Sequence, residues 1–261
     1  MSEAPNINER IEAATADCFW LPDEVSIVER PEIIYTHSRR PNAIFNRVLK
    51  VRPQLAEPKQ LVDEVHQAHA DTASRWYVNS LGDSNRLQAA LADAGYQKGA
   101  RHLSCAIGVH DYSRDVPDDV DVQSVETADG LRTLYRIQRE IFGGAHSTSE
   151  QALKRDLAHC TGDNRRVIRF VAYRNGEPAG CGGLTAFDEL QLGLIWAGGV
   201  IEDQRGHGVY TALLAARAQH AASRGLKWLG LYARENTSAP IVVAHGFEQH
   251  GYMVFFNRSQ P

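Results

Sequence analysis

Hydrophobic and polar residues follow a regular series of patterns in the second half of the chain. VDVQSVE at residues 120–126 alternates apolar and polar positions, as a half-buried strand does. LRTLYRIQREIF at 131–142 places its leucines and isoleucines on one face of a helix. SEQALKRDLAHC at 149–160 predicts a second helix, with Ser149 or Thr148 as N-cap. This part of the chain therefore predicts one strand followed by two helices.

Three strands and a second set of helices are predicted further along. Residues 166–187 form two apolar runs joined at Asn175-Gly176, a dipeptide typical of two-residue hairpins, and 190–201 is a third apolar run. After DQRGHGVY at 203–210, an alanine-rich helix runs to Gly225 as its C-cap. The remaining stretches predict a strand, a short helix and a last strand, at residues 226–233, 238–246 and 252–257.

An internal repeat links the two halves of the chain. Trp76 and Gly95 are 19 positions apart, Trp228 and Gly246 are 18 apart, and each glycine precedes an aromatic residue. The chain thus contains twice the predicted series of strand, helix, glycine-aromatic turn and strand. We favour duplication over a coincidence between two common αβ units. The first copy has VRPQLAE where the second has its glycine loop.

Composition limits the classes of function. The 261 residues are 43% hydrophobic and 23% charged with a net charge of −4, which gives no basic field for nucleic acid or anionic membranes. Four scattered cysteines without a C-x-x-C pair are typical of a reducing compartment. The acidic N-terminus lacks the apolar core of a signal peptide, and no apolar run reaches the roughly 20 residues of a membrane span. We expect a soluble cytoplasmic protein.

DQRGHGVY stands between a predicted strand and a predicted helix, where a fold can bind phosphate. A helix N-terminus offers unpaired N–H groups and partial positive charge, and glycines let the backbone approach an anion. Arg205 adds a fixed positive charge. The Walker pattern is absent, and the Rossmann pattern lacks its third glycine because Thr211 follows Tyr210. The stretch is suited to a pyrophosphate of another kind.

Arg205 to Tyr210 resembles the signature of the Gcn5-related N-acetyltransferase (GNAT) family, [QR]-x-x-G-x-[GA], with Tyr210 replacing the last small residue. The order of predicted elements and ENTSAPIVVAHGF, an asparagine before a short helix ending in Gly-Phe, resemble the family as well. The resemblance implies an α/β (α+β) GNAT fold with a mixed, mostly antiparallel sheet in two GNAT-like halves. Residues 1–115 would be a degenerate copy without a CoA loop, and 116–261 the acetyltransferase domain.

The resemblance also implies how the chain would hold acetyl-CoA as acyl donor. Backbone amides from Gly206 through His207, Gly208 and Val209 to Tyr210 would bind the pyrophosphate, with Arg205 beside them. Main chain at Val200 and Ile201 would pair with the pantetheine arm, and the Asn236 side chain would bind the same arm.

Catalytic groups are less evident. Many family members have a tyrosine acid four residues before the Gly-Phe glycine, and here that position is Val242. We name Glu189, the carboxylate nearest the start of the 190–201 strand, and Tyr232, at the end of the 226–233 strand, as candidates; a solvated turn residue and a packing tyrosine are the alternatives. The resemblance implies that the loop holding His146 borders the acceptor site; His146 is a candidate base there, and a surface-loop histidine is the alternative. His66 and His69 are spaced like metal ligands without a third ligand, so we interpret them as a polar helix face and expect no metal.

Two functions remain open, and the absent Walker and Rossmann patterns disfavour a third, a different phosphate-binding α/β enzyme. The first is an enzyme that transfers an acetyl group from acetyl-CoA to an amine, on a small molecule or a peptide. The second is a non-catalytic acyl-CoA-binding or regulatory module, which the valine at position 242 favours. The acceptor and the oligomeric state are not indicated by the sequence.

Overall fold

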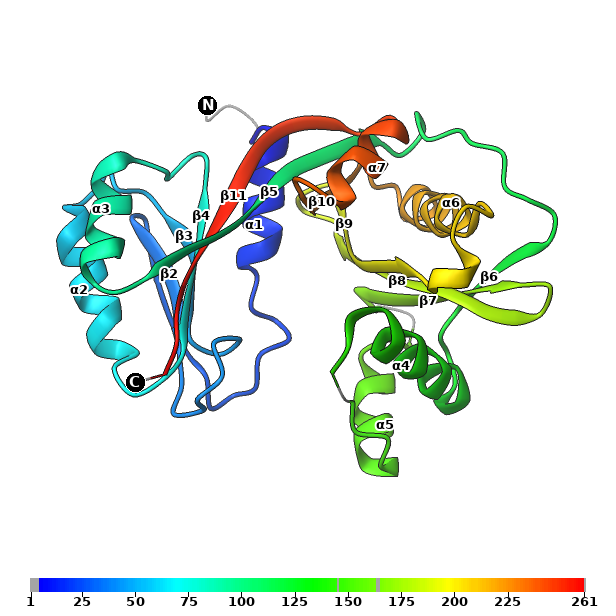
Figure 1. Cartoon of the computed structure of the whole chain (residues 1–261), viewed down its shortest axis with the longest axis horizontal. Coiled ribbons are helices and arrows are strands. Elements are labelled where there is room, and N and C mark those ends of the chain that lie inside the picture. Colours follow the sequence, from blue (N-terminus) through cyan, green and yellow to red (C-terminus); the bar gives the residue numbers. More distant parts are fainter. Residues whose placement is uncertain (1–4, 145, 163–164, 261) are drawn as a thin grey trace. The chain divides into compact units, whose positions relative to one another are not determined.

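The computed structural model describes residues 5–144, 146–162 and 165–260 (Figure 1). The chain divides into two compact units. One consists of residues 1–105 together with 232–261, and the other of residues 106–231. Each unit is built of helices packed on β-strands.

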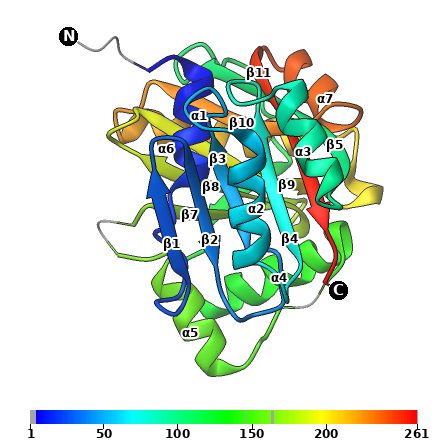
Figure 2. The same cartoon turned by 90° about the vertical axis from the view of Figure 1, so that its left-hand side faces the viewer.

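The elements of the first unit come from both ends of the chain. They are α1 (Ile7–Ala16), β1 (Ser26–Arg30), β2 (Ile33–His37), β3 (Arg47–Val51), α2 (Pro58–Ala68), β4 (Ser74–Asn79), α3 (Asn85–Asp93), β5 (Gln97–Gly108), α7 (Ser238–Ala244) and β11 (Glu248–Arg258). Their strand order is β1-β2-β3-β4-β11-β5. β1, β2 and β3 are antiparallel neighbours, β3 and β4 are parallel, and β4 and β11 are antiparallel. Helices α2 and α3 lie together on one face of these strands (Figure 2).

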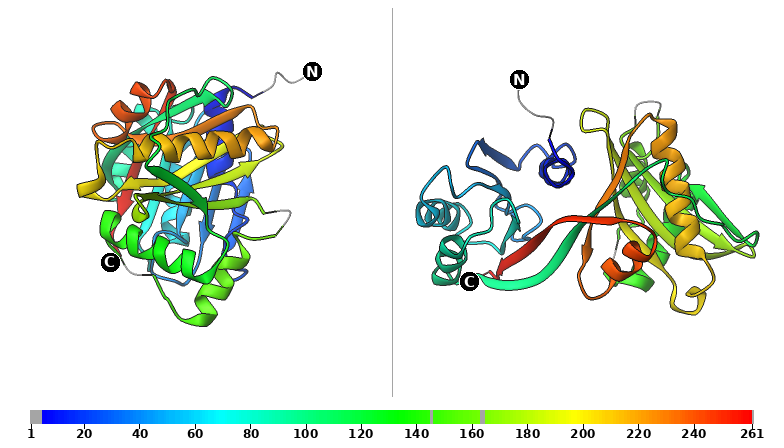
Figure 3. Two further views of the ribbon diagram at one scale, coloured as in Figure 1. Left: turned by 90° about the vertical axis from the view of Figure 1, so that its right-hand side faces the viewer. Right: turned by 90° about the horizontal axis from the view of Figure 1, so that it is seen from above.

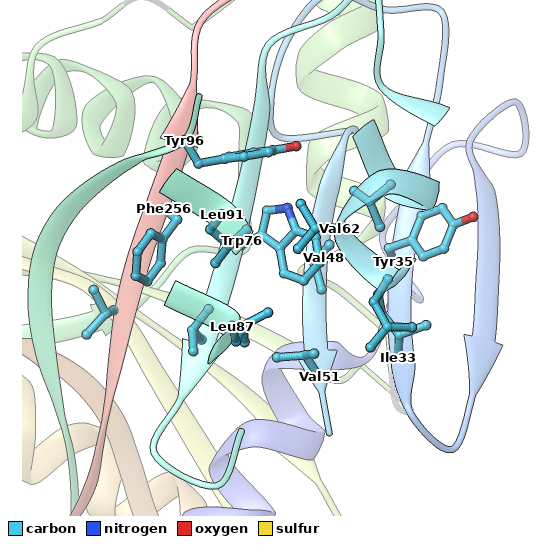
Figure 4. Packing of buried hydrophobic residues seen from close by; sticks show 14 residues of the cluster. Ile33, Tyr35, Val48, Val51, Val62, Trp76, Leu87, Leu91, Tyr96 and Phe256 are labelled. Carbon is cyan, nitrogen blue, oxygen red and sulfur yellow. The ribbon is translucent and has the colours of Figure 1, made fainter. Parts of the chain in front are cut away.

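The core of the first unit combines residues that lie far apart in the sequence. Trp76 of β4 is completely buried, and Leu87 and Leu91 of α3 pack in the same cluster. Phe256 of β11 completes this cluster from the end of the chain (Figure 4). Because β11 both pairs with β4 and contributes to this core, the C-terminal strand is part of the first unit.

The second unit contains the elements expected to bind phosphate. They are β6 (Val120–Ser124), α4 (Ala128–Phe142), α5 (Glu150–Ala158), β7 (Val167–Arg174), β8 (Glu177–Phe187), β9 (Leu192–Val200), the short 3-10 helix η1 (Glu202–Gln204), α6 (Val209–Ser223) and β10 (Trp228–Arg234). The strand order is β10-β9-β8-β7-β6, with only the β9–β10 pair parallel. Helices α4 and α6 cover opposite faces of these strands (Figures 1 and 3).

Local signals in the sequence set several boundaries of the second unit. Asn175 and Gly176 both have positive φ, 51° and 82°, as a tight hairpin between β7 and β8 requires. Ser149 is the N-cap of α5, and its side chain accepts a hydrogen bond from the Ala152 N–H. Gly225, with φ of 74°, follows α6. These three predictions are confirmed.

The order of elements is repeated along the chain. β1, β2, β3, α2, β4, α3 and β5 follow one another as β7, β8, β9, α6, β10, α7 and β11 do. In both series a parallel strand joins the third antiparallel strand. This recurrence supports duplication, while the degenerate nature of the first copy stays a prediction. The predicted division after residue 115 follows the repeat, whereas the compact units follow packing, so that division stays a prediction too.

The interpretation of His66 and His69 as one polar helix face is wrong for His69. The His69 ring is fully buried just after α2. Its Nε2 lies 2.7 Å from the Thr36 carbonyl oxygen and must therefore donate, so Nδ1 accepts from the Ser74 hydroxyl at 2.7 Å. His66 is exposed, as predicted. Both ring nitrogens of His69 are thus used inside the fold.

Candidate functional site

One edge of β9 is left open by the pairing of the strands. Along its other edge β9 pairs with β8 from Leu192 to Val200. The parallel pairs with β10 include only Leu192, Gly193 and Leu194, so β9 continues beyond the last of these pairs. Ala197 has a positive φ of 46° at the irregularity in the β8–β9 ladder. Such a bulge bends a strand, and the second part of β9 lies beyond its last pair with β10.

Val200 and Ile201 differ in what their main chains can offer. The Ile201 N–H donates to the Ala179 oxygen at 2.9 Å, and the Ile201 oxygen accepts from Gln204 N–H at 3.0 Å. Neighbouring residues of a strand point to opposite edges, so the Val200 N–H points away from β8. The Val200 oxygen accepts from Arg205 Nε at 3.3 Å. Of the two predicted residues, Val200 alone keeps a main-chain group available for pairing.

The predicted phosphate loop leads directly into α6. Gly208 is the N-cap of this helix in the left-handed conformation, and no side chain caps the helix. The Ala212 N–H donates the first helical hydrogen bond, to the Gly208 oxygen at 3.0 Å. The N–H groups of the first turn, including those of Val209 and Tyr210, therefore face outward from the helix start, where an anion is favoured. His207 and Arg205 are exposed beside this turn.

The two glycines of the loop have different surroundings. Both have positive φ, 78° at Gly206 and 75° at Gly208. A Cβ on Gly206 would meet nothing within 4 Å, whereas one on Gly208 would lie 2.4 Å from Pro117 Cγ. Pro117 belongs to the irregular segment between β5 and β6. Gly208 is therefore required by a close contact with this segment as well as by its backbone conformation.

Tyr210 packs beneath α6 on the sheet side. A Cβ on Gly198 of β9 would lie 3.2 Å from Tyr210 Cε2. The same spot is 3.1 Å from Nη1 of Arg217, a residue of α6 that is only 1% exposed. The tyrosine ring therefore fills the space between helix and strand where the family pattern has a small residue.

A pocket of about 380 Å³ opens on the α4 side of the same unit. At one wall the rings of Tyr135 and His146 stack with centroids 4.3 Å apart. The Tyr135 hydroxyl donates to Asp156 Oδ2 at 2.7 Å and accepts from Arg169 Nη1 at 3.2 Å. Trp196 of β9 also lines this pocket.

Burial and hydrogen bonds set the protonation states of Tyr135 and Asp156 in this pocket. Burial raises the pKa of Tyr135 to about 12, helped by its bond to Asp156. Burial opposes ionisation of Asp156, but hydrogen bonds from Tyr135 and Arg155 prevail and lower the pKa of its carboxyl. Near pH 7 Asp156 is thus a carboxylate and Tyr135 a neutral phenol.

The structure does not bring the two predicted catalytic residues to this pocket. Glu189 is exposed in the turn before β9, 3.9 Å from Arg166, and β9 then runs about 26 Å to the phosphate loop. Tyr232 falls in the first unit, where its hydroxyl accepts from Asn79 Nδ2 at 2.7 Å and where burial raises its pKa. Asn236 is exposed in the turn before α7, also in the first unit.

The residues that sequence reasoning missed are Arg217, Arg169, Tyr135 and Asp156. Arg217 lies within the alanine-rich helix and Tyr135 beside the apolar face of α4. The sequence predicted both helices, but not which side chains surround these two residues. Among the described residues no cluster of histidine, cysteine, aspartate or glutamate suited to a metal ion is found. In that same part of the chain, no helix has the length and apolar character of a membrane span.

Comparison with known proteins gives one family match. Residues 131–247 match the model of the acetyltransferase (GNAT) family. No curated protein matches the sequence significantly.

Several solved structures are similar in fold. A GCN5-related N-acetyltransferase from Kribbella flavida has a TM-score of 0.67 at 14% identity, covering 90% of this chain and 89% of its own. A GCN5-related N-acetyltransferase from Sphaerobacter thermophilus reaches 0.63 at 16%, covering 88% and 81%. A tandem GNAT protein from the clavulanic acid biosynthesis pathway, without AcCoA, reaches 0.64 at 14%, covering 100% and 90%. The chain therefore has the GNAT fold, with a mixed, mostly antiparallel arrangement of strands.

Proposed function

Since residues 131–247 match the model of the acetyltransferase (GNAT) family, we propose that this protein transfers an acetyl group from acetyl-CoA to an amine. The family supports acyl transfer in general; the donor and the amine acceptor are our proposal. The second unit would bind the donor along β9 and at the start of α6. The acceptor would enter from the α4 side.

The observation that carries the proposal is the continuity between an open strand edge and an uncapped helix. Val200 offers an N–H on the free edge of β9, and eight residues later Gly208 starts α6 without a side-chain cap. An extended amide-bearing arm can pair with such an edge, and a pyrophosphate can follow at the helix start. Acyl-CoA has these two parts in this order.

The pocket beside Trp196 suits the acceptor. Ala197, at the bulge of β9, lines this pocket, so the pocket reaches the strand along which the donor would lie. Its volume of about 380 Å³ suits a small amine or one side chain of a peptide.

His146 is our candidate for proton removal from the amine. An attacking amine must lose a proton, and a neutral imidazole nitrogen can accept one. Asp156 is a poor base because its hydrogen bonds lower the pKa of its carboxyl. His146→Gln is expected to lower kcat by about 10²–10⁴-fold while leaving the affinity for acetyl-CoA unchanged. His159→Gln, an exposed histidine after α5, is the matched control and should keep full activity.

The direct test is release of free thiol from acetyl-CoA in the presence of amines. Small amines, amino acids and a lysine-containing peptide are offered in turn, and acylated products are identified by mass spectrometry. Turnover of any amine supports the enzyme. Absence of acetyl-CoA binding by calorimetry would refute the proposal.

A non-catalytic acyl-CoA-binding module is the second candidate. Val242, where the family resemblance leads us to expect a tyrosine acid, is completely buried and cannot donate a proton. Tight CoA binding without turnover on any amine would favour this alternative. Positioning alone can lower a barrier by several kcal/mol, so the missing tyrosine does not exclude catalysis.

A further inference from the structure

Arg217 is a buried cation on the sheet side of α6. Its side chain is 1% exposed, and its Nε donates to the Leu213 carbonyl at 2.8 Å. Its Nη2 is buried without a hydrogen-bond partner. A guanidinium stays charged in proteins, although burial lowers the pKa of Arg217. The helix thus holds a positive charge out of water with part of its hydrogen-bonding capacity unused.

The groups around this cation do not neutralise it. Its charge is favoured by the phenol of Tyr210, which also forms a hydrogen bond with it, by the phenol of Tyr112 and by the thiol of Cys181. Burial raises the pKa of both Tyr112 and Cys181 to about 12, so both are neutral near pH 7. No carboxylate is among these groups in the described part of the chain. Replacing a buried ion by an apolar residue often stabilises a protein, so packing alone does not explain an arginine here.

The strands make room for the guanidinium with glycines. A Cβ on Gly182 or on Gly198 would lie 3.1 Å from Arg217 Nη1, so each strand approaches the charge without a side chain. These glycines belong to β8 and β9, the pair that carries the open edge. The sheet is therefore shaped around the charge.

The guanidinium lies near the first turn of α6. Helical side chains lean toward the N-terminus. Accordingly, Arg217 reaches back to Tyr210, the second residue of α6, with its guanidinium carbon 5.8 Å from the ring centroid. Because its Nε bonds to the carbonyl of Leu213, the fifth residue of α6, the charge lies about one helical turn beyond the uncapped N–H groups that follow Gly208. The partial charge at the N-terminus of α6 and the full charge of Arg217 are both positive, so both favour an anion at the start of this helix.

We propose that Arg217 is a buried counter-charge for the pyrophosphate of CoA, and that the ligand supplies the anion this cation lacks in the free protein. The inference rests on the proposed acyl-CoA site and adds a positioning residue that acts through the first turn of α6 and across low-dielectric protein. The interaction is electrostatic, so it distinguishes phosphate-bearing donors from neutral ones. The neutral pantetheine arm gains nothing from it.

The test compares a charged and a neutral ligand on variants that remove or keep the charge. Calorimetry measures CoA and S-acetylpantetheine on the wild-type chain and on the Arg217→Met, Arg217→Gln and Arg217→Lys variants. Met and Gln are expected to weaken CoA about tenfold or more, which corresponds to about 1.4 kcal/mol. Affinity for S-acetylpantetheine should stay within twofold, and Lys should keep most of the CoA affinity. Arg136→Met, which removes an exposed charge on α4, is the matched control and should bind like wild type.

Three results would overturn the inference. One is CoA affinity unchanged in folded Met and Gln variants. Another is an equal loss of CoA and S-acetylpantetheine, which indicates a merely structural residue. The third is failure of both uncharged variants to fold, because the fold would then need the cation without ligand. Wild-type protein that binds no CoA refutes the proposed function itself, whereas wild-type binding with unaffected variants refutes only the role of Arg217.

Discussion

Gly206 and Gly208 share a left-handed backbone but differ in their neighbours. A side chain on Gly206 would extend into open space, and one on Gly208 would overlap Pro117. A substitution at 208 therefore disturbs the contact with the segment before β6 as well as any phosphate. Position 206 separates the two effects.

We expect Gly206→Ala to lower the free energy of CoA binding by more than it lowers the free energy of unfolding. A non-glycine residue in this conformation costs about 1–2 kcal/mol, and its methyl group would occupy the open side of the loop. Gly208→Ala adds the overlap with Pro117, so its total cost should be about 2–5 kcal/mol. Thermal unfolding and calorimetry with CoA are measured on both variants. A larger stability loss at 206 than at 208 would contradict this assignment.

His69 makes the first unit sensitive to acid. Burial lowers its pKa from 6.5 to about 4, so the folded protein holds it neutral where the unfolded chain binds a proton. Between these pH values the unfolded state carries more protons, and stability falls as the pH drops. The contribution lost by pH 4 is about 3 kcal/mol.

Urea unfolding of wild type and His69→Gln between pH 7 and pH 4 tests this expectation. The variant is less stable at pH 7 because it breaks the bonds to Thr36 and Ser74. Its stability should nevertheless fall less steeply with acid than that of wild type. Parallel pH profiles would show that His69 is not the titrating group.

At the scale of elements, β9 presents different groups to its two sides. The Val200 N–H points to the open edge, and the Ile201 N–H bonds to Ala179 of β8. Proline removes an N–H and is tolerated where that N–H faces away from the sheet. Two adjacent substitutions therefore test which edge is used.

Val200→Pro should preserve the fold and weaken CoA binding about 2–10-fold, the value of one hydrogen bond. Ile201→Pro should lower the unfolding temperature because the bond to Ala179 is lost. Thermal unfolding and CoA titration measure both effects. If Val200→Pro unfolds the protein while Ile201→Pro does not, the Val200 N–H, and not the Ile201 N–H, is the one that bonds within the sheet.

At the scale of the whole molecule, the last strand stabilises the unit that begins the chain. β11 pairs with β4 from Met253 opposite Asn79 to Arg258 opposite Ser74, and its Phe256 is 3% exposed in the core. The two ends of the chain therefore fold together. Loss of the C-terminal strand should affect the first unit directly.

Phe256→Ala should destabilise the first unit by about 3–5 kcal/mol, because it leaves a cavity beside Trp76. Phe255→Ala should cost less, since that half-buried ring packs on Tyr77 outside this core. Urea unfolding followed by tryptophan fluorescence measures both variants. Equal losses of unfolding free energy in the two variants would show that Phe256 contributes no more to the core than Phe255 does.

The sequence by itself determined the features that depend on neighbouring residues. Asn175-Gly176 specified the hairpin because few other dipeptides adopt two positive φ angles. The glycines before α6 indicated the phosphate loop because the sequence also predicted the end of a strand before them and the start of a helix after them. Periodicity likewise predicted α4, α5 and α6.

Tertiary structure decided which of these elements meet. Alternation along a strand shows which face is buried but not which strand lies beside it, so the pairing of β11 with β4 was not predictable from pattern. Arg217 looked like an ordinary polar residue of a helix until Gly182 and Gly198 enclosed it. Burial and charge at a site depend on elements distant in sequence, and only their packing sets both.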